Sequence, residues 1–221
     1  MLQIDKIYNG DCLEIMKQIE DKSIALVLTD PPYGFLNNIV CFSSGKGKCK
    51  AKPRQFQTNW DKPIGQDYFN DLFRISLNQI IFGFEYYAHY LPISRGIYCW
   101  DKKKPDSNNL DYGKFELIWT SFNQPTRFIR YTWNGMIREG NDDIKHPTQK
   151  PIKIIENLLI NHSKENDIIL DPFLGSGTTA VACINLNRHY IGIELSEEYC
   201  NKAEKRIAEA VKEKEQQPNL L

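Results

Sequence analysis

Four consecutive residues, Asp30-Pro31-Pro32-Tyr33, have the types and the spacing to handle an amino group. They directly follow an apolar run over 24–28, which predicts a buried parallel strand. In open α/β sheets, ligands bind at the carboxyl ends of such strands. We therefore expect this turn to lie at the ligand-binding edge of a sheet.

The chemistry that this turn favours is methylation of an exocyclic amine on a nucleic-acid base. That nitrogen is a poor nucleophile because its lone pair is delocalised into the ring. The carboxylate of Asp30 and the carbonyl of Pro31 could each accept one N–H and turn the lone pair toward a methyl donor. The prolines stiffen the turn by fixing φ, and Tyr33 offers a face on which an extruded base could stack. An ordinary turn at the end of a strand is the alternative interpretation.

A second motif, over 167–180, has the pattern of a strand, a glycine-rich turn and a helix. Gly175 and Gly177 would let the backbone approach a ligand, and the helix N-terminus favours a carboxylate or a phosphate. The next strand ends in Glu194, about 20 residues on, where nucleoside-binding folds place an acid for the ribose. The pattern also fits the G-x-G-x-x-A dinucleotide fingerprint, so taken alone it allows a nicotinamide oxidoreductase.

Together the two motifs resemble those of the S-adenosylmethionine-dependent DNA amino-methyltransferases. The amine motif comes first and the cofactor motif last, which is similar to the permuted beta class of that family. Two further segments strengthen the resemblance: His-Pro-Thr-Gln-Lys-Pro at 146–151 and Asn-Gly-Asp-Cys at 9–12. The resemblance covers roughly residues 6–34 and 145–207, and the middle of the chain matches more loosely.

The resemblance implies roles for the matching residues. Lys150 and the hydroxyl groups of Ser176 and Thr178 would bind the cofactor carboxylate, Glu194 the ribose, and Asp11 the adenine. The implied cofactor-binding residues are Asp11, Asp30, Lys150, Asp171, Phe173, Gly175, Ser176, Gly177, Thr178 and Glu194, and the implied catalytic residues are Asp30, Pro31, Pro32 and Tyr33. Two have ordinary alternatives: Asp11 as the N-cap of the first helix, and Lys150 as an exposed lysine where a helix starts.

Two segments of the middle region are candidates for DNA contact. The stretch 44–54 has no acid, and its basic residues are Lys46, Lys48, Lys50, Lys52 and Arg54. It is interpreted as a phosphate-contacting loop or, alternatively, as a solvated mobile loop. The stretch 121–140 interleaves aromatic residues with arginines, among them Arg127 and Arg130, which could read bases or phosphates. Tyr33 and Phe122 are the candidate walls of a base pocket.

Size and composition limit the alternatives. The 221 residues suit one domain, and 28 basic residues balance 28 acidic ones, so DNA binding must depend on local basic surface. Six cysteines without a C-x-x-C pair, and no secretory segment, indicate a cytoplasmic protein without a metal site. No apolar run reaches the ~18 residues of a membrane helix.

We therefore expect an α/β, Rossmann-like class I methyltransferase: a mostly parallel seven-stranded sheet flanked by helices, with permuted motif order. The domain would span 1–221, with a mobile basic loop at about 35–64 and a target-recognition insertion at about 121–145. Among the expected elements are a helix over 68–77, a strand over 80–84 and strands over 96–100 and 115–120.

The expected activity is site-specific transfer of a methyl group from S-adenosyl-L-methionine to N6 of adenine in double-stranded DNA. The Asp at the head of the motif is typical of the adenine enzymes in the resembled family, and cytosine-N4 methylation is the nearest alternative. A nicotinamide-dependent oxidoreductase and a non-catalytic DNA-binding module are the others. A homodimer and a separate restriction endonuclease are compatible with the sequence as further partners.

Overall fold

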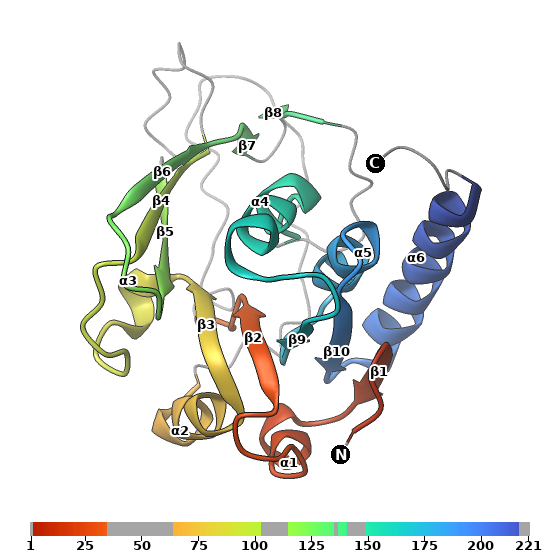
Figure 1. Cartoon of the computed structure of the whole chain (residues 1–221), viewed down its shortest axis with the longest axis horizontal. Helices are drawn as coiled ribbons and strands as arrows, with labels where there is room; N and C mark the ends of the chain where they lie inside the picture. The colour runs from red at the N-terminus through yellow and green to blue at the C-terminus, as the bar shows by residue number, and fades with distance from the viewer. Residues whose placement is uncertain (1, 35–63, 103–114, 135–136, 141–148, 217–221) are drawn as a thin grey trace, which may run out of the picture.

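The computed structural model describes residues 2–34, 64–102, 115–134, 137–140 and 149–216. Its middle layer is an eight-stranded sheet (Figure 1). The strands of this sheet are β1 (Lys6–Asn9), β2 (Ile24–Thr29), β3 (Ser76–Phe82), β4 (Ile97–Asp101), β5 (Phe115–Thr120), β6 (Arg127–Arg130), β9 (Ile168–Asp171) and β10 (His189–Glu194). Their order is β1-β10-β9-β2-β3-β5-β4-β6. Only β5 runs antiparallel to its neighbours, so the expected mostly parallel α/β architecture is confirmed.

The expected number of seven strands was wrong, because β6 adds an eighth. This strand pairs in parallel with β4 and lies at the edge of the sheet. Its Arg127 and Phe128 are both exposed, so the alternation of buried and exposed side chains that marks a strand is missing. A short hairpin follows, formed by β7 (Trp133–Asn134) and β8 (Ile137–Arg138).

Helices cover both faces of the sheet (Figure 1). They are α1 (Cys12–Met16), α2 (Gln66–Ile75), α3 (Phe84–Tyr87), α4 (Ile152–His162), α5 (Thr178–Asn185) and α6 (Glu197–Gln216). Alternate residues of one strand serve the two cores: Leu26 and Leu28 pack with α4, α5 and α6, whereas Val27 packs with α1, α2 and α3. In the part of the chain that the structure describes, no helix combines the length and the apolarity needed to cross a membrane.

The boundary between α2 and β3 differs from the expectation. A helix was expected to continue to Leu77, but α2 ends at Ile75 and β3 begins with Ser76. The Ser76 hydroxyl donates to the carbonyl of Leu72 at 2.6 Å and takes up an acceptor of the last helical turn. Leu77 is largely exposed, so it does not belong to the apolar face of the helix.

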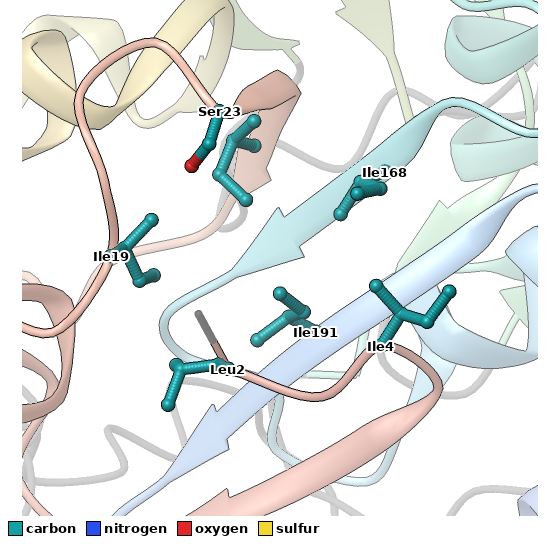
Figure 2. A pocket seen from close by; sticks show the side chains of 7 residues that line it. Leu2, Ile4, Ile19, Ser23, Ile168 and Ile191 are labelled. Atoms are coloured by element: carbon teal, nitrogen blue, oxygen red, sulfur yellow. The ribbon is translucent and has the colours of Figure 1, made fainter.

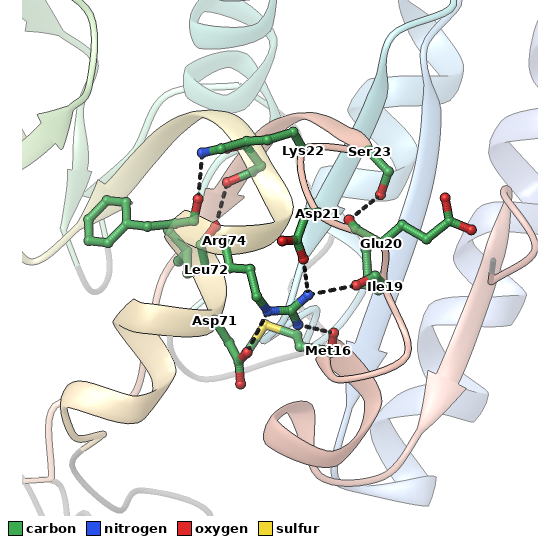
Figure 3. A network of polar contacts seen from close by, with 11 residues as sticks. Met16, Ile19, Glu20, Asp21, Lys22, Ser23, Asp71, Leu72 and Arg74 are labelled. Atoms are coloured by element: carbon green, nitrogen blue, oxygen red, sulfur yellow. Dashed lines mark hydrogen bonds and ion pairs between the residues drawn. The ribbon is translucent and has the colours of Figure 1, made fainter.

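Arg74 ties α2 to the end of α1 (Figure 3). Its guanidinium donates to the carbonyls of Met16 and Ile19 at 3.0 and 2.9 Å, and to the carboxylates of Asp21 and Asp71 at 2.7 and 3.0 Å. A cation at the C-terminal end of a helix also interacts favourably with the helix dipole. The contacts fix the loop that leads from α1 into β2.

A small apolar pocket lies near the start of β2, β9 and β10 (Figure 2). It is lined by Leu2, Ile4, Ile19, Ser23, Ile24, Ile168 and Ile191. Ile24 and Ile168 are the first residues of β2 and β9. The pocket is therefore at the sheet edge opposite the one where the acidic motif residues follow their strands.

Candidate active site

The two predicted motifs meet at one edge of the sheet. Strand β2 lies between β9 and β3, and Val27 pairs with Leu170 in the parallel register. Asp30 follows the end of β2, and Asp171 is the last residue of β9. On the other side of β9, Gly192 pairs with Asp171, and β10 then ends at Glu194. Three acids from distant parts of the sequence thus lie along the carboxyl ends of three adjacent strands.

Both carboxylate oxygens of Asp30 accept hydrogen bonds. Oδ1 accepts from the Tyr33 hydroxyl and Oδ2 from Lys150 Nζ, each at 2.6 Å. Burial raises the pKa of Asp30 and the charge of Glu116 adds to it, while the Lys150 ammonium opposes the rise. Burial and the charge of Asp30 hold the pKa of Tyr33 well above its usual value, so its hydroxyl remains a proton donor. Asp30 is therefore a buried acceptor whose position is fixed by two donors.

The ring of Tyr33 lies in an aromatic cluster with residues of α3. It stacks on Tyr86 with the ring centroids 4.5 Å apart and is tilted against Tyr87 at 6.2 Å. The Tyr87 hydroxyl donates to the carbonyl of Pro32. This hydrogen bond and the stacking hold the double-proline turn against α3. Tyr86 is a contact that the sequence reasoning missed, because a lone aromatic in a short helix carries no signal of its own.

Lys150 lies on the amine side of the site. Its ammonium forms ion pairs with Asp30 at 2.6 Å and with Glu116 at 3.0 Å, and its side chain is 13% exposed. Glu116 was missed in the sequence, although an acid inside an apolar strand is a recognisable signal. The alternative of an exposed lysine at a helix start is wrong, because the side chain is buried just before α4.

The glycine turn is held by Glu194 and by α6. The carboxylate of Glu194 accepts from the backbone N–H groups of Gly175 and Ser196, each at 2.8 Å. Gly177 has φ +85°, and a Cβ there would lie 3.0 Å from the Cβ of Ala203 in α6. Both glycines have positive φ, which L side chains rarely adopt, so the turn requires them.

Asp171 lies beneath this turn. Its Oδ2 accepts from the Thr179 hydroxyl at 2.6 Å and its Oδ1 from the N–H of Phe173 at 3.1 Å. Burial raises its pKa from an ordinary 3.8 to about 7, even though both hydrogen bonds oppose the rise. Burial likewise raises the pKa of Glu194. The turn thus has two acids that a bound cation would favour in the charged form.

The hydroxyl groups of the turn contact a buried arginine of α6. Arg206 Nη1 donates to the Ser176 carbonyl at 3.2 Å and lies 3.0 Å from Thr178 Oγ1. The Ser176 hydroxyl donates to Gln149 Oε1 at 2.8 Å. Arg206 was also missed. Its signal was its place in the buried stripe of α6, formed by Cys200, Ala203, Arg206 and Ala210. That Lys150, Ser176 and Thr178 share a cofactor carboxylate stays a prediction.

Asp11 caps α1, as the alternative interpretation expected. Its carboxylate accepts from the N–H of Leu13 at 2.8 Å. The adjacent Gly10 donates its N–H to the Glu194 carbonyl at 3.0 Å, which brings Asp11 to the same end of the sheet as the cofactor turn. A cap uses one carboxylate oxygen, so this role does not exclude a ligand contact.

Phe122 does not lie beside Tyr33. Thr120, two residues earlier, pairs with Ile80, and β5 runs antiparallel to β3, so the chain moves away from the carboxyl end of β3. The Phe122 ring stacks on His162, the last residue of α4, with centroids 4.3 Å apart. This placement contradicts Phe122 as the second wall of a pocket at Tyr33. The sequence misled because the strand preceding Phe122 runs in the opposite direction to its neighbours.

The predicted DNA-binding residues separate into three places. Arg130 pairs in register with Asp101 at the carboxyl end of β4, on the same edge as Asp30, and its Nε lies 3.5 Å from the Asp101 carboxylate. Arg127 pairs with Tyr98, toward the other end of the strand. The five basic residues of 44–54 lie outside the described residues, as does most of the loop expected at 35–64.

Comparison with known proteins identifies the family. A family model for DNA methylase (N6_N4_Mtase) matches residues 95–205, half of the chain. The chain is 29% identical to the type II methyltransferase M2.LlaDCHI of Lactococcus lactis subsp. cremoris, over 91% of this chain and 88% of the relative. It is 28% identical to M.HinfI of Haemophilus influenzae, a type II methyltransferase, over 93% of this chain and 69% of the relative.

Solved structures have the same fold. The M1.HpyAVI complex with S-adenosylmethionine superimposes with a TM-score of 0.58 at 24% identity, covering 91% of this chain and 98% of that one. PvuII DNA methyltransferase, cytosine-N4-specific, superimposes with a TM-score of 0.62 at 15% identity, covering 94% and 91%. The chain belongs to the S-adenosylmethionine-dependent DNA amino-methyltransferases, the N6/N4 DNA methylase family.

Proposed function

We propose that this methyltransferase modifies N6 of adenine in double-stranded DNA, with Asp30 and the double-proline turn receiving the amine. The observation that carries the proposal is the adjacency of β2 and β9. It places Asp30, which can accept an amine proton, next to Asp171 and the glycine turn of the cofactor motif. Amine and methyl donor would thereby meet at one edge of the sheet.

The residues around the glycine turn fit S-adenosylmethionine. Asp171 and Glu194 are buried acids for a ligand that carries a sulfonium and an ammonium, and the glycines leave room beside the backbone. When bound, the cofactor supplies an electrophilic methyl group. Asp30 accepts one N–H of the amine, and the raised pKa of its carboxyl suits it to take the proton that the nitrogen sheds on methylation. Tyr33, held by α3, is the surface on which the extruded base stacks.

Adenine is favoured over cytosine by the residue at the head of the motif. The adenine enzymes of the family typically have Asp there, as at position 30, whereas the cytosine-N4 enzymes more often have Ser. The fold itself does not separate the two, since a cytosine-N4-specific enzyme superimposes over most of the chain. Cytosine N4 is therefore the second candidate, as both amines present two N–H groups to the same acceptors.

The direct experiment is incubation of unmethylated DNA with methyl-labelled cofactor, followed by nuclease digestion and mass spectrometry of the nucleosides. We expect N6-methyladenine. Labelled N4-methylcytosine would move the assignment to the second candidate, and no labelled nucleoside from protein that binds both DNA and cofactor would refute the proposal.

Asp30→Asn tests the role of the carboxylate. This variant should keep its affinity for cofactor and DNA and lose methyl transfer. Asp67→Asn, an exposed acid in the first turn of α2, is the matched control and should transfer at the wild-type rate. Full activity of Asp30→Asn would remove Asp30 from the chemistry.

Other features of the proposal depend on the sequence. The basic stretch 44–54 is proposed to contact phosphates, and 121–145 to contribute to target recognition. Arg130 supports the second assignment because it lies at the edge of the sheet shared with Asp30. A cytoplasmic location, a homodimer and a separate restriction endonuclease stay predictions.

A further inference from the structure

Glu116 is a buried acid of the site that belongs to neither motif. It is the second residue of β5, where that antiparallel strand starts at the edge at which β3 ends. One carboxylate oxygen lies 3.0 Å from Lys150 Nζ and the other 3.1 Å from Lys102 Nζ, and the side chain is 10% exposed. It thus joins Lys102, which follows β4, to the ammonium that contacts Asp30.

The four charges form a closed chain: Lys102, Glu116, Lys150 and Asp30 alternate in sign. Burial alone would raise the pKa of Glu116, but the two ammonium groups outweigh burial and lower it. Burial would lower the pKa of Lys150, yet Asp30 and Glu116 raise it. Lys150 therefore stays charged, and a buried charge is costly unless it is paired.

Binding of the target amine changes this arrangement. Asp30 must offer a carboxylate oxygen to the amine, and both oxygens already accept bonds, from Tyr33 and Lys150. If Lys150 gives up its bond to Asp30, its ammonium still needs a buried acceptor. Glu116 lies at 3.0 Å on the same ammonium and can be that acceptor.

Resting on the proposed role of Asp30, we propose that Glu116 is a positioning residue for methyl transfer, which retains the Lys150 ammonium while Asp30 exchanges it for the amine of the base. Lys102 neutralises Glu116 and keeps the pair of lysines balanced against the pair of acids. Glu85 of α3 and Asp171 of β9 are further acids whose charge reaches the cluster, and Tyr33 donates into it.

The test is Glu116→Gln, assayed by methyl transfer across pH. Without the second acid, Lys150 binds Asp30 alone, so the amine competes less well. We expect kcat to fall about 10- to 100-fold, the range for losing a charged hydrogen bond. The acid limb of the pH profile should move to lower pH, because the charge of Glu116 raises the pKa of Asp30. Cofactor affinity should be unchanged.

Two variants keep the test independent of folding. Lys102→Met removes the cation that offsets Glu116, and should shift the acid limb the opposite way, to higher pH. Glu156→Gln is the matched control, since Glu156 is a glutamate of similar exposure (12%), paired with Lys153 at 2.9 Å in α4. It should leave both kcat and the pH profile at wild-type values.

The outcomes are distinct. A wild-type pH profile and kcat in Glu116→Gln, or equal shifts in Glu116→Gln and Glu156→Gln, would overturn the role of Glu116 and leave DNA methylation standing. If the wild-type protein labels no nucleoside at all, the proposed function itself fails. Opposite shifts in Glu116→Gln and Lys102→Met would support the role of Glu116, because a general loss of stability does not change the direction of a titration.

Discussion

The ring of Tyr33 lies directly against Gly83: a Cβ on residue 83 would be 2.3 Å from Tyr33 Cε1. Gly83 has φ +69° and precedes the first residue of α3. We predict that Gly83→Ala displaces Tyr33 and destabilises the fold by about 1–3 kcal/mol through backbone strain. Methyl transfer should fall while cofactor affinity persists, as measured by chemical denaturation, labelled transfer and calorimetry.

Gly65→Ala is the control for that substitution. Gly65 precedes the first residue of α2 with φ −108°, and an added Cβ there meets no atom within 4 Å. Its transfer rate should match the wild type. Equal losses in the two variants would show that the contact between Tyr33 and Gly83 has no special role.

The sequence predicted the site's main carboxylates because each stands in a local pattern. Asp30, Asp171 and Glu194 each end or follow an apolar strand, so parallel pairing alone brings them to one edge. Glu116 and Arg206 stand in no motif. Their roles depend on which strands and helices become neighbours, which no local spacing records.

Phe122 shows the same limit in another form. Its local context, an aromatic directly after a strand, resembles that of Tyr33. What separates them is strand direction, since β5 is the antiparallel member of the sheet. The exposed edge strand β6 was missed for a related reason, because a strand at an edge is not required to bury alternate side chains.

Protonation of Asp171 should make stability depend on pH. Its pKa of about 7 in the native state exceeds the ordinary 3.8, so the native protein binds more protons than the unfolded chain between these values. This group's contribution to the free energy of unfolding therefore falls as pH rises from about 4 to about 7. Urea denaturation of wild type and Asp171→Asn at several pH values should show the fall only where the carboxyl is present.

Cofactor binding should report the same titration from the other side. A sulfonium and an ammonium favour the ionised form of Asp171, so binding below pH 7 should release protons. Calorimetry in two buffers of different ionisation enthalpy measures that release. Asp171→Asn should release fewer protons than the wild type, and an identical release would assign the titration to another group, such as Glu194.

Arg74 should contribute to stability without touching the chemistry. Arg74→Met removes the donor for the Met16 and Ile19 carbonyls and should cost about 1–3 kcal/mol in the free energy of unfolding. Thermal or urea denaturation measures the cost. Lys17→Met breaks an exposed pair with Glu14 and should change stability little. A similar effect of both substitutions would mean that the carbonyl contacts of Arg74 are unimportant.

The two arginines of β6 should differ in their contribution to DNA binding. Arg130 is at the edge of the sheet shared with Asp30, and its side chain is 64% exposed. Arg130→Gln should weaken DNA binding and lower the slope of log affinity against log salt by about 1. Arg127→Gln, at the other end of the same strand, is the comparison and should leave the slope nearly unchanged. Fluorescence anisotropy over a salt series would separate them, and equal slopes would exclude a special role for Arg130.

The ion pair between Lys150 and Asp30 joins residues 120 positions apart. A nascent polypeptide that has left the ribosome only as far as β3 contains the acid but neither its cation nor the glycine turn. Strand β2 must then wait for β9 to fill its free edge before the two reacting ligands can meet. Methylation is consequently a property that arises at the end of translation, and a truncated chain should fold poorly and leave DNA unmarked.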